Sequence, residues 1–419
     1  MEKDTVKVAN ENNYEEKLGD WVDKEKKAIS IINNVGHLLY ENSVELVFFR
    51  NPLVDRSISE ILSLFQYAED VVQKPIRIEY SAEIAKNLVN LDLAPSKVDL
   101  GKLTYEWEKE KDNFNEDIST FLDHKLSNFK GNGKEDFQPR DVILYGFGRI
   151  GRLCARELIQ QAGSGHQLRL KAIVTRTCTE KDIVKRAALL RMDSVHGPFP
   201  GTVKEDPDNS SLIINGQIVK MIGADSPNEL DYTQHNINNA LVIDNSGAFR
   251  TREKLGLHLK AKGVSKALLT APGKEDIPNI VFGINHECFG RDNEDLFSAA
   301  SCTTNAIVPI LKVVKDNFGI ESGHMETIHA YTNDQNLLDN MHKKNRRGRS
   351  AAINMVLTET GAANAVTKIY PELEGKLSAN AVRVPTPDGS LAILNLRISR
   401  ETSREEVNQA FKNEALEGE

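Results

Sequence analysis

The chemistry of this chain is expected to centre on Cys302, at the junction of a predicted strand and a predicted helix. Residues 296–300 are apolar and then small, and apolar residues afterwards recur at helical spacing until Gly319. Unpaired backbone amides and the helix dipole at such a junction favour a thiolate over a thiol. Hydroxyls of Ser301 and Thr303 suit an anionic ligand there. An isolated cysteine is more often an apolar filler, but this setting favours a nucleophile.

A base for this thiol is expected at His329, on a predicted strand that covers residues 327–332. His329 follows Cys302 by 27 positions, an interval that fits one helix and one returning strand. A cysteine that attacks a carbonyl needs a nearby group to move the proton, and His329 is the best-placed candidate. The alternative is a packed or surface histidine, which is the commoner role of a lone histidine on a strand.

Downstream segments carry groups that suit phosphate. Thr360 supplies a hydroxyl beside Gly361, and Arg383 supplies a guanidinium. Residues 343–349 form a basic loop, which is either a solvated charge run or an anion-facing surface near the cofactor or substrate.

A second chemical motif, Gly-Phe-Gly-Arg-Ile-Gly, occupies residues 146–151. The apolar strand 142–145 precedes it, a helix with one apolar face follows, and another strand covers 168–174. In this order the glycines allow a tight turn and let a pyrophosphate approach the helix N-terminus. The motif alone is weak evidence, but this context predicts dinucleotide binding.

The end of the second strand bears on the choice between NAD and NADP. An acidic residue there usually binds a free ribose 2′-hydroxyl, but this chain has Thr175 and Arg176. Because no acidic residue is present there to repel a 2′-phosphate, and Arg176 could pair with one, use of NADP or of both cofactors is favoured. The alternative is that Arg176 points into solvent. Later strand ends are expected to line the same crevice. The expected cofactor residues are Gly146, Phe147, Gly148, Arg149, Ile150, Gly151, Thr175, Arg176, Ser246, Gly247 and Thr270.

Length and composition restrict the class of protein. With 419 residues the chain is expected to form two or three domains. Its net charge of −8 argues against broad binding to nucleic acid or anionic membranes, and no apolar run could span a bilayer. Four scattered cysteines indicate neither a disulfide framework nor a metal site. The charged N-terminus shows no secretory segment, so the cytoplasm is the default compartment.

Three domains are expected along the chain. Residues 1–138 are polar and helix-like, with capping-box spacing at Ser57 and Glu60, and we predict an all-α extension followed by a linker. Residues 139–301 are predicted to form a Rossmann domain that binds NAD(P), and residues 302–419 a catalytic domain. The extension carries no catalytic constellation; it is either a structural module or a module for partner binding or oligomerisation.

From Asp141 onward the chain resembles the phosphorylating glyceraldehyde-3-phosphate dehydrogenases. The order and spacing of the matching segments make the resemblance specific; they are residues 146–151, 193–197, 258–260, 283–287, 301–305, 358–363 and 383–386. The extension is similar to that of a longer subgroup of the family. Tyr145 replaces the usual asparagine and Thr175 the usual acid, as in NADP-tolerant branches. The family pattern continues for several dozen residues beyond the position of Glu419, so the catalytic domain is expected to be incomplete here.

The resemblance implies an α/β fold in which a Rossmann domain precedes an α+β catalytic domain with an antiparallel sheet, assembled as a homotetramer. It implies that Cys302 forms a hemithioacetal with glyceraldehyde 3-phosphate and that His329 takes the proton and assists hydride transfer. Inorganic phosphate then attacks the thioester and yields 1,3-bisphosphoglycerate. The implied phosphate contacts are Ser301, Thr303 and Thr360 with Gly361 for the attacking phosphate, and Thr332 and Arg383 for the substrate phosphate.

Two alternatives stay open from the sequence. Erythrose 4-phosphate is the runner-up substrate within the same enzyme class. A non-catalytic binding or scaffold relative, which would use the extension, is the alternative from another class. The sequence does not decide between a glycolytic and a gluconeogenic direction.

Overall fold

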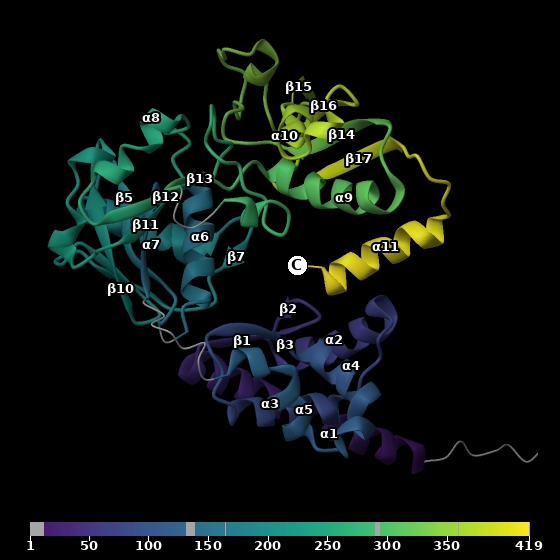
Figure 1. Ribbon diagram of the computed structural model, residues 1–419. Coiled ribbons are helices and arrows are strands. Elements are labelled where there is room, and N and C mark those ends of the chain that lie inside the picture. The colour runs from purple at the N-terminus through teal and green to yellow at the C-terminus, as the bar shows by residue number, and fades with distance from the viewer. Residues whose placement is uncertain (1–11, 131–138, 164, 290–293, 359, 419) are drawn as a thin grey trace, which may run out of the picture. The chain divides into compact units, whose positions relative to one another are not determined.

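The structure is a computed structural model that describes residues 12–130, 139–163, 165–289, 294–358 and 360–418 (Figure 1). It divides into two compact units. The N-terminal unit comprises Met1–Arg140 with Leu158–Arg169, and the C-terminal unit comprises Asp141–Glu157 with Leu170–Glu419. The predicted linker falls mainly on residues 131–138, which lie outside the described residues.

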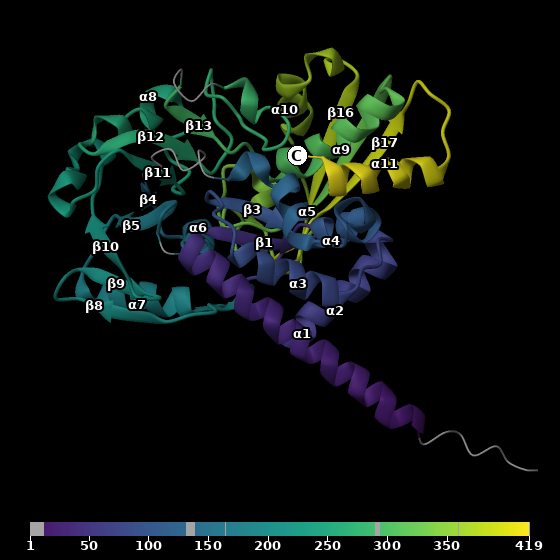
Figure 2. The same ribbon diagram turned by 60° about the horizontal axis from the view of Figure 1, so that its bottom comes forward.

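Helices dominate the N-terminal unit. α1 is the longest, and its first half extends beyond the other helices of the unit (Figure 2). Trp107 and Phe121 pack in the interior with their ring centroids 5.3 Å apart. The helices are α1 (Asn12–Asn42), α2 (Ile58–Tyr67), α3 (Ile78–Val89), α4 (Leu100–Glu110) and α5 (Ile118–Lys125).

The all-α prediction for the extension holds for these helices but missed a small sheet. Strands β1 (Val44–Phe48), β2 (Asn51–Pro52) and β3 (Ser96–Asp99) form a sheet in the order β2-β1-β3. β1 and β3 run parallel, and sequences of five and four residues are too short to show strand periodicity.

The predicted capping box at the start of α2 is confirmed. The Ser57 side chain accepts a hydrogen bond from the Glu60 amide at 3.3 Å, and the Glu60 carboxylate accepts one from the Ser57 amide at 2.8 Å. These contacts satisfy amides that the first helical turn leaves unpaired.

The C-terminal unit begins with the predicted Rossmann arrangement. Its larger sheet has the order β13-β12-β11-β4-β5-β10-β9-β8, and β4 lies between β11 and β5. Parallel pairs join β4 to β11, β11 to β12, β12 to β13 and β5 to β10, so their carboxyl ends share one edge. The strands are β4 (Arg140–Tyr145), β5 (Leu168–Thr175), β8 (Val203–Asp206), β9 (Ser211–Ile214), β10 (Gln217–Gly223), β11 (Ala240–Asp244), β12 (Val264–Leu269) and β13 (Leu296–Ser298).

Three helices and two short strands accompany this sheet. They are α6 (Arg149–Gln160), α7 (Glu180–Arg191), α8 (Arg252–Leu255), β6 (Met192–Asp193) and β7 (Gly197–Pro198). α6 starts within the predicted glycine motif, so the expected strand–turn–helix order is present.

A second sheet carries the catalytic domain in the order β15-β16-β14-β17. It is mixed rather than antiparallel, because its central pair β14–β16 is parallel while both outer pairs are antiparallel. Helices α9, α10 and α11 share one apolar cluster with residues of this sheet, and α11 lies below α9 in Figure 1. The elements are α9 (Cys302–Phe318), β14 (Ser322–Ala330), β15 (Val356–Thr358), α10 (Ala362–Ile369), β16 (Leu377–Val384), β17 (Leu391–Arg397) and α11 (Arg404–Glu417).

None of the helices in the described part of the chain combines the length and the apolar character that crossing a bilayer requires.

Candidate active site

The glycine motif forms the turn between β4 and α6. Gly146 has φ +94°, and a Cβ there would lie 3.1 Å from the Ser246 amide nitrogen. A Cβ on Gly151 would collide with the Gly146 carbonyl oxygen, whereas Gly148 has open space on that side. The first and third glycines therefore permit the turn and its packing, and the second leaves room for a ligand above the N-terminus of α6.

A cavity of about 310 Å³ lies beside this turn. Of the predicted cofactor residues, Gly146, Phe147, Gly148, Thr175, Arg176 and Ser246 line it. Burial raises the pKa of Tyr145, another lining residue, to about 12, so its hydroxyl stays protonated. Arg186 from α7 also lines the cavity, and its Nε is buried without a hydrogen-bond partner among the described residues. Asp225, which follows the carboxyl end of β10, is the one acidic residue among the described residues that line this cavity.

The other predicted cofactor residues lie outside this cavity lining. Gly247, with φ +69°, and Thr270 follow strand ends, and the Thr270 hydroxyl donates to the Asp244 carbonyl oxygen at 3.0 Å. Ile150 is exposed at the start of α6, and the Arg149 guanidinium lies against the Pro387 carbonyl oxygen. Arg149 and Ile150 can therefore reach a ligand through their backbone amides.

Cys302 is the first residue of α9, as the sequence predicted. Ala300 adopts φ +57° where the chain turns from β13, and Ser301 caps the helix by accepting from the Thr304 amide at 3.0 Å. The Asn305 side chain ties the turn together, because it donates to the Ala299 and Ser301 carbonyl oxygens at 2.7 and 2.9 Å. The thiol is thus held at the amide-rich end of a seventeen-residue helix.

His329 lies beside this thiol. Its Nε2 is 3.5 Å from Cys302 Sγ, within hydrogen-bonding reach for sulfur. This contact lowers the pKa of Cys302 from its usual 9.0 to about 7, although burial opposes the shift. The same contact raises the pKa of His329, against its own burial. The pair therefore favours a thiolate beside an imidazolium near neutral pH.

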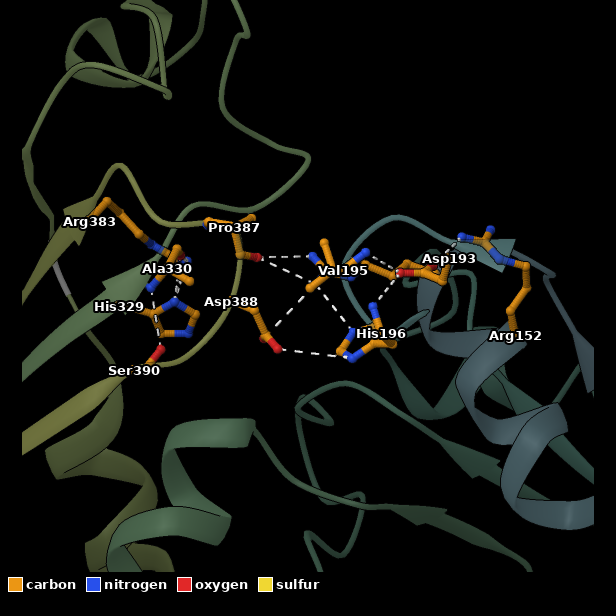
Figure 3. Close-up of polar contacts among 11 residues, drawn as sticks. Arg152, Asp193, Val195, His196, His329, Ala330, Arg383, Pro387, Asp388 and Ser390 are labelled. Atoms are coloured by element: carbon orange, nitrogen blue, oxygen red, sulfur yellow. Dashed lines mark hydrogen bonds and ion pairs between the residues drawn. The ribbon is translucent and has the colours of Figure 1, made fainter. Parts of the chain in front are cut away.

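The other face of the imidazole meets Ala330 and Arg383 (Figure 3). His329 Nδ1 is 2.7 Å from the Ala330 carbonyl oxygen, which also accepts from Arg383 Nη1 at 2.9 Å. A protonated Nδ1 donates to this oxygen and leaves the Nε2 lone pair for the thiol, whereas an unprotonated Nδ1 accepts from Arg383 Nη1 and leaves Nε2–H to donate to the thiolate. Arg383 Nη1 lies 2.8 Å from Nδ1, and its charge opposes protonation of the ring.

A cavity of about 430 Å³ opens onto the thiol and the imidazole. The predicted residues that line it are Ser301, Cys302, Thr303, His329, Thr360, Gly361 and Arg383. Arg250 and Lys368 add two more cations, and no carboxylate is present in this lining among the described residues. Three cations and no carboxylate among the described lining residues make the cavity suited to an anionic substrate, and Asp334 interacts with Arg383 from outside the lining.

Thr332 lies outside this cavity lining. Its hydroxyl donates to Asp334, which also accepts from Arg347. Arg347 in turn donates to the Thr358 hydroxyl at 2.8 Å, and Thr358 lines the cavity. The structure therefore joins Thr332 to the site through two intermediate side chains.

Sequence reasoning missed several lining residues, of which Arg250, Lys368, Arg186 and Asp225 carry charge. Arg250 directly follows the predicted strand-end segment that contains Ser246, and this position could have identified it as a lining residue. Lys368 and Arg186 are single cations on helices, and nothing in their local sequence separates them from solvated surface charges.

Two of the other three cysteines differ from Cys302, and the third shares its exposure. Burial raises the pKa of Cys154 and Cys178, whereas Cys288 is exposed. Among the described residues, no three histidine, cysteine or acidic side chains gather where they could hold a metal ion.

Comparison with known proteins identifies the family. Residues 140–252 match the profile described as "Glyceraldehyde 3-phosphate dehydrogenase, NAD binding domain", and residues 301–418 match that of its C-terminal domain. A "Glyceraldehyde-3-phosphate dehydrogenase-like protein" from Pseudomonas aeruginosa (strain UCBPP-PA14) is 47% identical over 385 residues, which cover 91% of this chain and 83% of the relative.

Two further relatives match about two thirds of the chain. The chloroplastic glyceraldehyde-3-phosphate dehydrogenase A of Zea mays is 43% identical over 275 residues, 65% of this chain and 66% of that protein. Glyceraldehyde-3-phosphate dehydrogenase 1 of Bacillus subtilis (strain 168) is 40% identical over 277 residues, 66% of this chain and 78% of that protein. The chain therefore belongs to the glyceraldehyde-3-phosphate dehydrogenase family, which confirms the resemblance seen in its sequence.

Proposed function

We propose that this protein oxidises glyceraldehyde 3-phosphate to 1,3-bisphosphoglycerate, with inorganic phosphate as co-substrate and NADP or NAD as hydride acceptor. The observation that supports this most is the Cys302–His329 pair, 3.5 Å apart, at a cavity lined by three cations. A thiolate there can attack an aldehyde, and the cations suit two phosphate groups. We further propose the homotetramer and the cytoplasmic location that are common for the family.

The proposed steps assign one role to each group. The Cys302 thiolate adds to the aldehyde carbon, and the resulting oxyanion takes a proton to give a thiohemiacetal. His329 then removes that hydroxyl proton through Nε2 as a hydride leaves the same carbon, which yields a thioester on Sγ. Inorganic phosphate attacks the thioester carbon, and the Cys302 thiolate departs. Ser301, Thr303 and Thr360 are the proposed contacts of the attacking phosphate, and Arg383 with Thr332 those of the substrate phosphate.

The residues around the glycine motif fit a dinucleotide. Gly148 offers open space above the N-terminus of α6, so a pyrophosphate can meet the amides there. Arg176 and Arg186 are the proposed partners of a 2′-phosphate, and Asp225 is placed to accept from a ribose hydroxyl. The nicotinamide ring supplies the hydride acceptor when the cofactor is bound.

We expect reduction of NADP or NAD that depends on both glyceraldehyde 3-phosphate and inorganic phosphate and that is lost in Cys302→Ser. The measurement is the initial rate of absorbance change for each cofactor, with arsenate and with no added anion as comparisons. A substrate panel that includes erythrose 4-phosphate separates the two aldehydes. Equal rates in the parent and Cys302→Ser, or no turnover by a chain that binds nucleotide, would contradict the proposal and favour a binding role.

We expect Arg176→Ala and Arg186→Ala each to weaken NADP binding about five- to thirtyfold, because each removes one charge-assisted contact to a 2′-phosphate. NAD binding should change less than twofold. The measurement is titration with NADPH and NADH followed by nucleotide fluorescence. Lys185→Ala is the matched control, because Lys185 is an exposed cation on the same helix outside the cavity. Equal losses for both nucleotides would assign the arginines to another part of the cofactor.

A further inference from the structure

The turn that joins β16 to β17 is held by residues from the dinucleotide-binding part of the unit (Figure 3). Arg149 Nη1 and Nη2 donate to the Pro387 carbonyl oxygen at 3.3 and 3.4 Å. The Asp388 carboxylate lies 3.9 Å from Arg149 and 4.0 Å from His196 Nδ1. Pro387, Asp388 and Ser390 are all exposed, so packing restrains this turn weakly and its polar contacts must position it.

The segment that carries His196 is itself rigidly held. The Asp193 carboxylate accepts from the amides of Val195 and His196 at 3.0 Å each, and from Arg152 at 3.1 Å. The two amide bonds, with Arg152, hold the pKa of Asp193 well below its usual range, so this carboxylate stays charged. Arg149 and His196, whose side chains are 3.3 Å apart, therefore form a fixed edge against which the turn rests.

The other end of the turn reaches the catalytic histidine. The Ser390 hydroxyl accepts from the Ala330 amide at 3.3 Å, and Ala330 directly follows His329. The Ala330 carbonyl oxygen is the group that meets His329 Nδ1 at 2.7 Å. Contacts on both sides of Ala330 thus determine where the imidazole points.

We propose that Arg149 is a positioning residue for His329. Arg149 holds the Pro387–Ser390 turn and so fixes the position of Ser390. Ser390 in turn fixes Ala330, and Ala330 sets how His329 Nε2 approaches Cys302 Sγ. Arg149 belongs to the glycine motif, so the contact joins the pyrophosphate turn to the catalytic pair, two regions of the sequence more than 150 residues apart. The inference rests on the proposed roles of Cys302 and His329.

The competing explanation is that Arg149 serves only the cofactor. The two explanations are distinguished by measuring the reactivity of the Cys302 thiol in the cofactor-free protein. In the full chain carrying Cys288→Ser, which removes the other exposed thiol, the rate of reaction with 4,4′-dithiodipyridine is followed between pH 5 and pH 10. The midpoint of this profile reports the thiolate that His329 stabilises, and it requires neither substrate nor turnover.

We expect Arg149→Met to raise the midpoint by about half a pH unit, which lowers the rate at pH 6.5 about two- to threefold. Ser390→Ala should give the same shift, and the double variant should show no further shift, because both changes interrupt one route. Arg149→Lys, which can still donate to the Pro387 carbonyl, should recover much of the parent profile. Arg397→Met is the control, since Arg397 pairs with Glu321 and is largely exposed.

Other outcomes would overturn the proposal. If Arg149→Met weakens NADPH binding but leaves the pH profile of Cys302 unchanged, Arg149 acts on the cofactor alone. If the shifts of Arg149→Met and Ser390→Ala add in full, the turn does not connect them. Should one variant fail to fold, the other single variant still tests the route. If the protein shows no activity on glyceraldehyde 3-phosphate but the variants still shift the pH midpoint of Cys302 reactivity, the proposed function is contradicted and this inference stands.

Discussion

Replacing His329 with asparagine is expected to lower turnover by about 10²–10⁴-fold and to abolish the low pKa of Cys302. The imidazole is the largest cause of that low pKa, and burial of the thiol acts in the opposite direction. Without His329 the pKa should return from about 7 to its usual 9.0 or above. The thiolate fraction at pH 7 then falls from about one half to about 1%.

The reactivity of the thiol gives this prediction a second, sharper form. A thiolate of higher pKa is intrinsically more nucleophilic, by about eightfold for a change of two pH units. The variant should therefore react with 4,4′-dithiodipyridine about sixfold more slowly at pH 7 and about eightfold faster above pH 10, so the two profiles cross near pH 8. Cys302→Ser, in the same Cys288→Ser background, gives the signal from other thiols. Superimposable profiles would mean that the N-terminus of α9, and not His329, stabilises the thiolate.

The parts of the site that could be predicted from sequence depend on local interactions. Cys302 is placed by a helix cap at Ser301 and a left-handed turn at Ala300, and both act within a few residues. The glycine motif is local in the same way, because the positive φ of Gly146 and the packing of Gly151 are set within one turn. Residue types alone therefore predicted that Cys302 begins a helix and that the glycine motif turns a strand into a helix, as the structure shows.

The relations between distant segments could not be predicted in this way. His329 lies directly opposite Arg383 because β14 pairs in parallel with β16, although β15 and α10 lie between them in the sequence. Alternation along a strand shows which face a residue occupies but not which strand lies next to it. The 2.8 Å approach of Arg383 to His329 follows from this pairing, and the contact of Arg149 with Pro387, across 238 positions, follows from the tertiary packing of a helix against a turn.

The small sheet of the extension was missed for a related reason. Val44–Phe48 is a five-residue segment with four apolar residues and Glu45, and so short a segment is equally consistent with a strand and with a buried helical segment. Its parallel partner β3 begins 52 positions after it, so only the folded chain shows that the run is a strand. The role of this extension stays a prediction, either as a structural module or as a module for partner binding or oligomerisation.

A buried pair of an aspartate and a histidine supports the loop beside the cofactor cavity. Asp244 and His258 are both fully buried, with Asp244 Oδ2 2.8 Å from His258 Nε2. The other carboxylate oxygen accepts from the amide and the hydroxyl of Ser246, at 2.7 Å each. Tyr145 and Phe249 pack edge-on against the imidazole and exclude water from it. One carboxylate thus satisfies three donors around a loop that lines the cavity.

Asp244→Ala is therefore expected to destabilise the dinucleotide-binding part of the C-terminal unit by about 3–5 kcal/mol, because it leaves the buried His258 imidazole, and the amide and hydroxyl of Ser246, without their partner. His258 Nδ1 already has no hydrogen-bond partner among the described residues, so the ring would then have none on either nitrogen. The measurement is native-state hydrogen exchange of the β11 and β12 amides, which reports the free energy of opening for this region. Asp231→Ala, which removes a more exposed helix cap, is the control and should cost about 1 kcal/mol.

Asp244→Asn distinguishes the charge of the pair from its shape. An asparagine can keep an oxygen toward Ser246 and turn its amide toward His258 Nε2, which can accept if the imidazole is neutral. If the pair holds a protonated histidine, the asparagine variant should lose nearly as much free energy of opening as the alanine variant, because a buried cation then lacks its counter-charge. If the histidine is neutral, the loss should stay near 1 kcal/mol. An alanine variant as stable as Asp231→Ala would contradict the assigned role of the pair, since the three donors would then have found other partners.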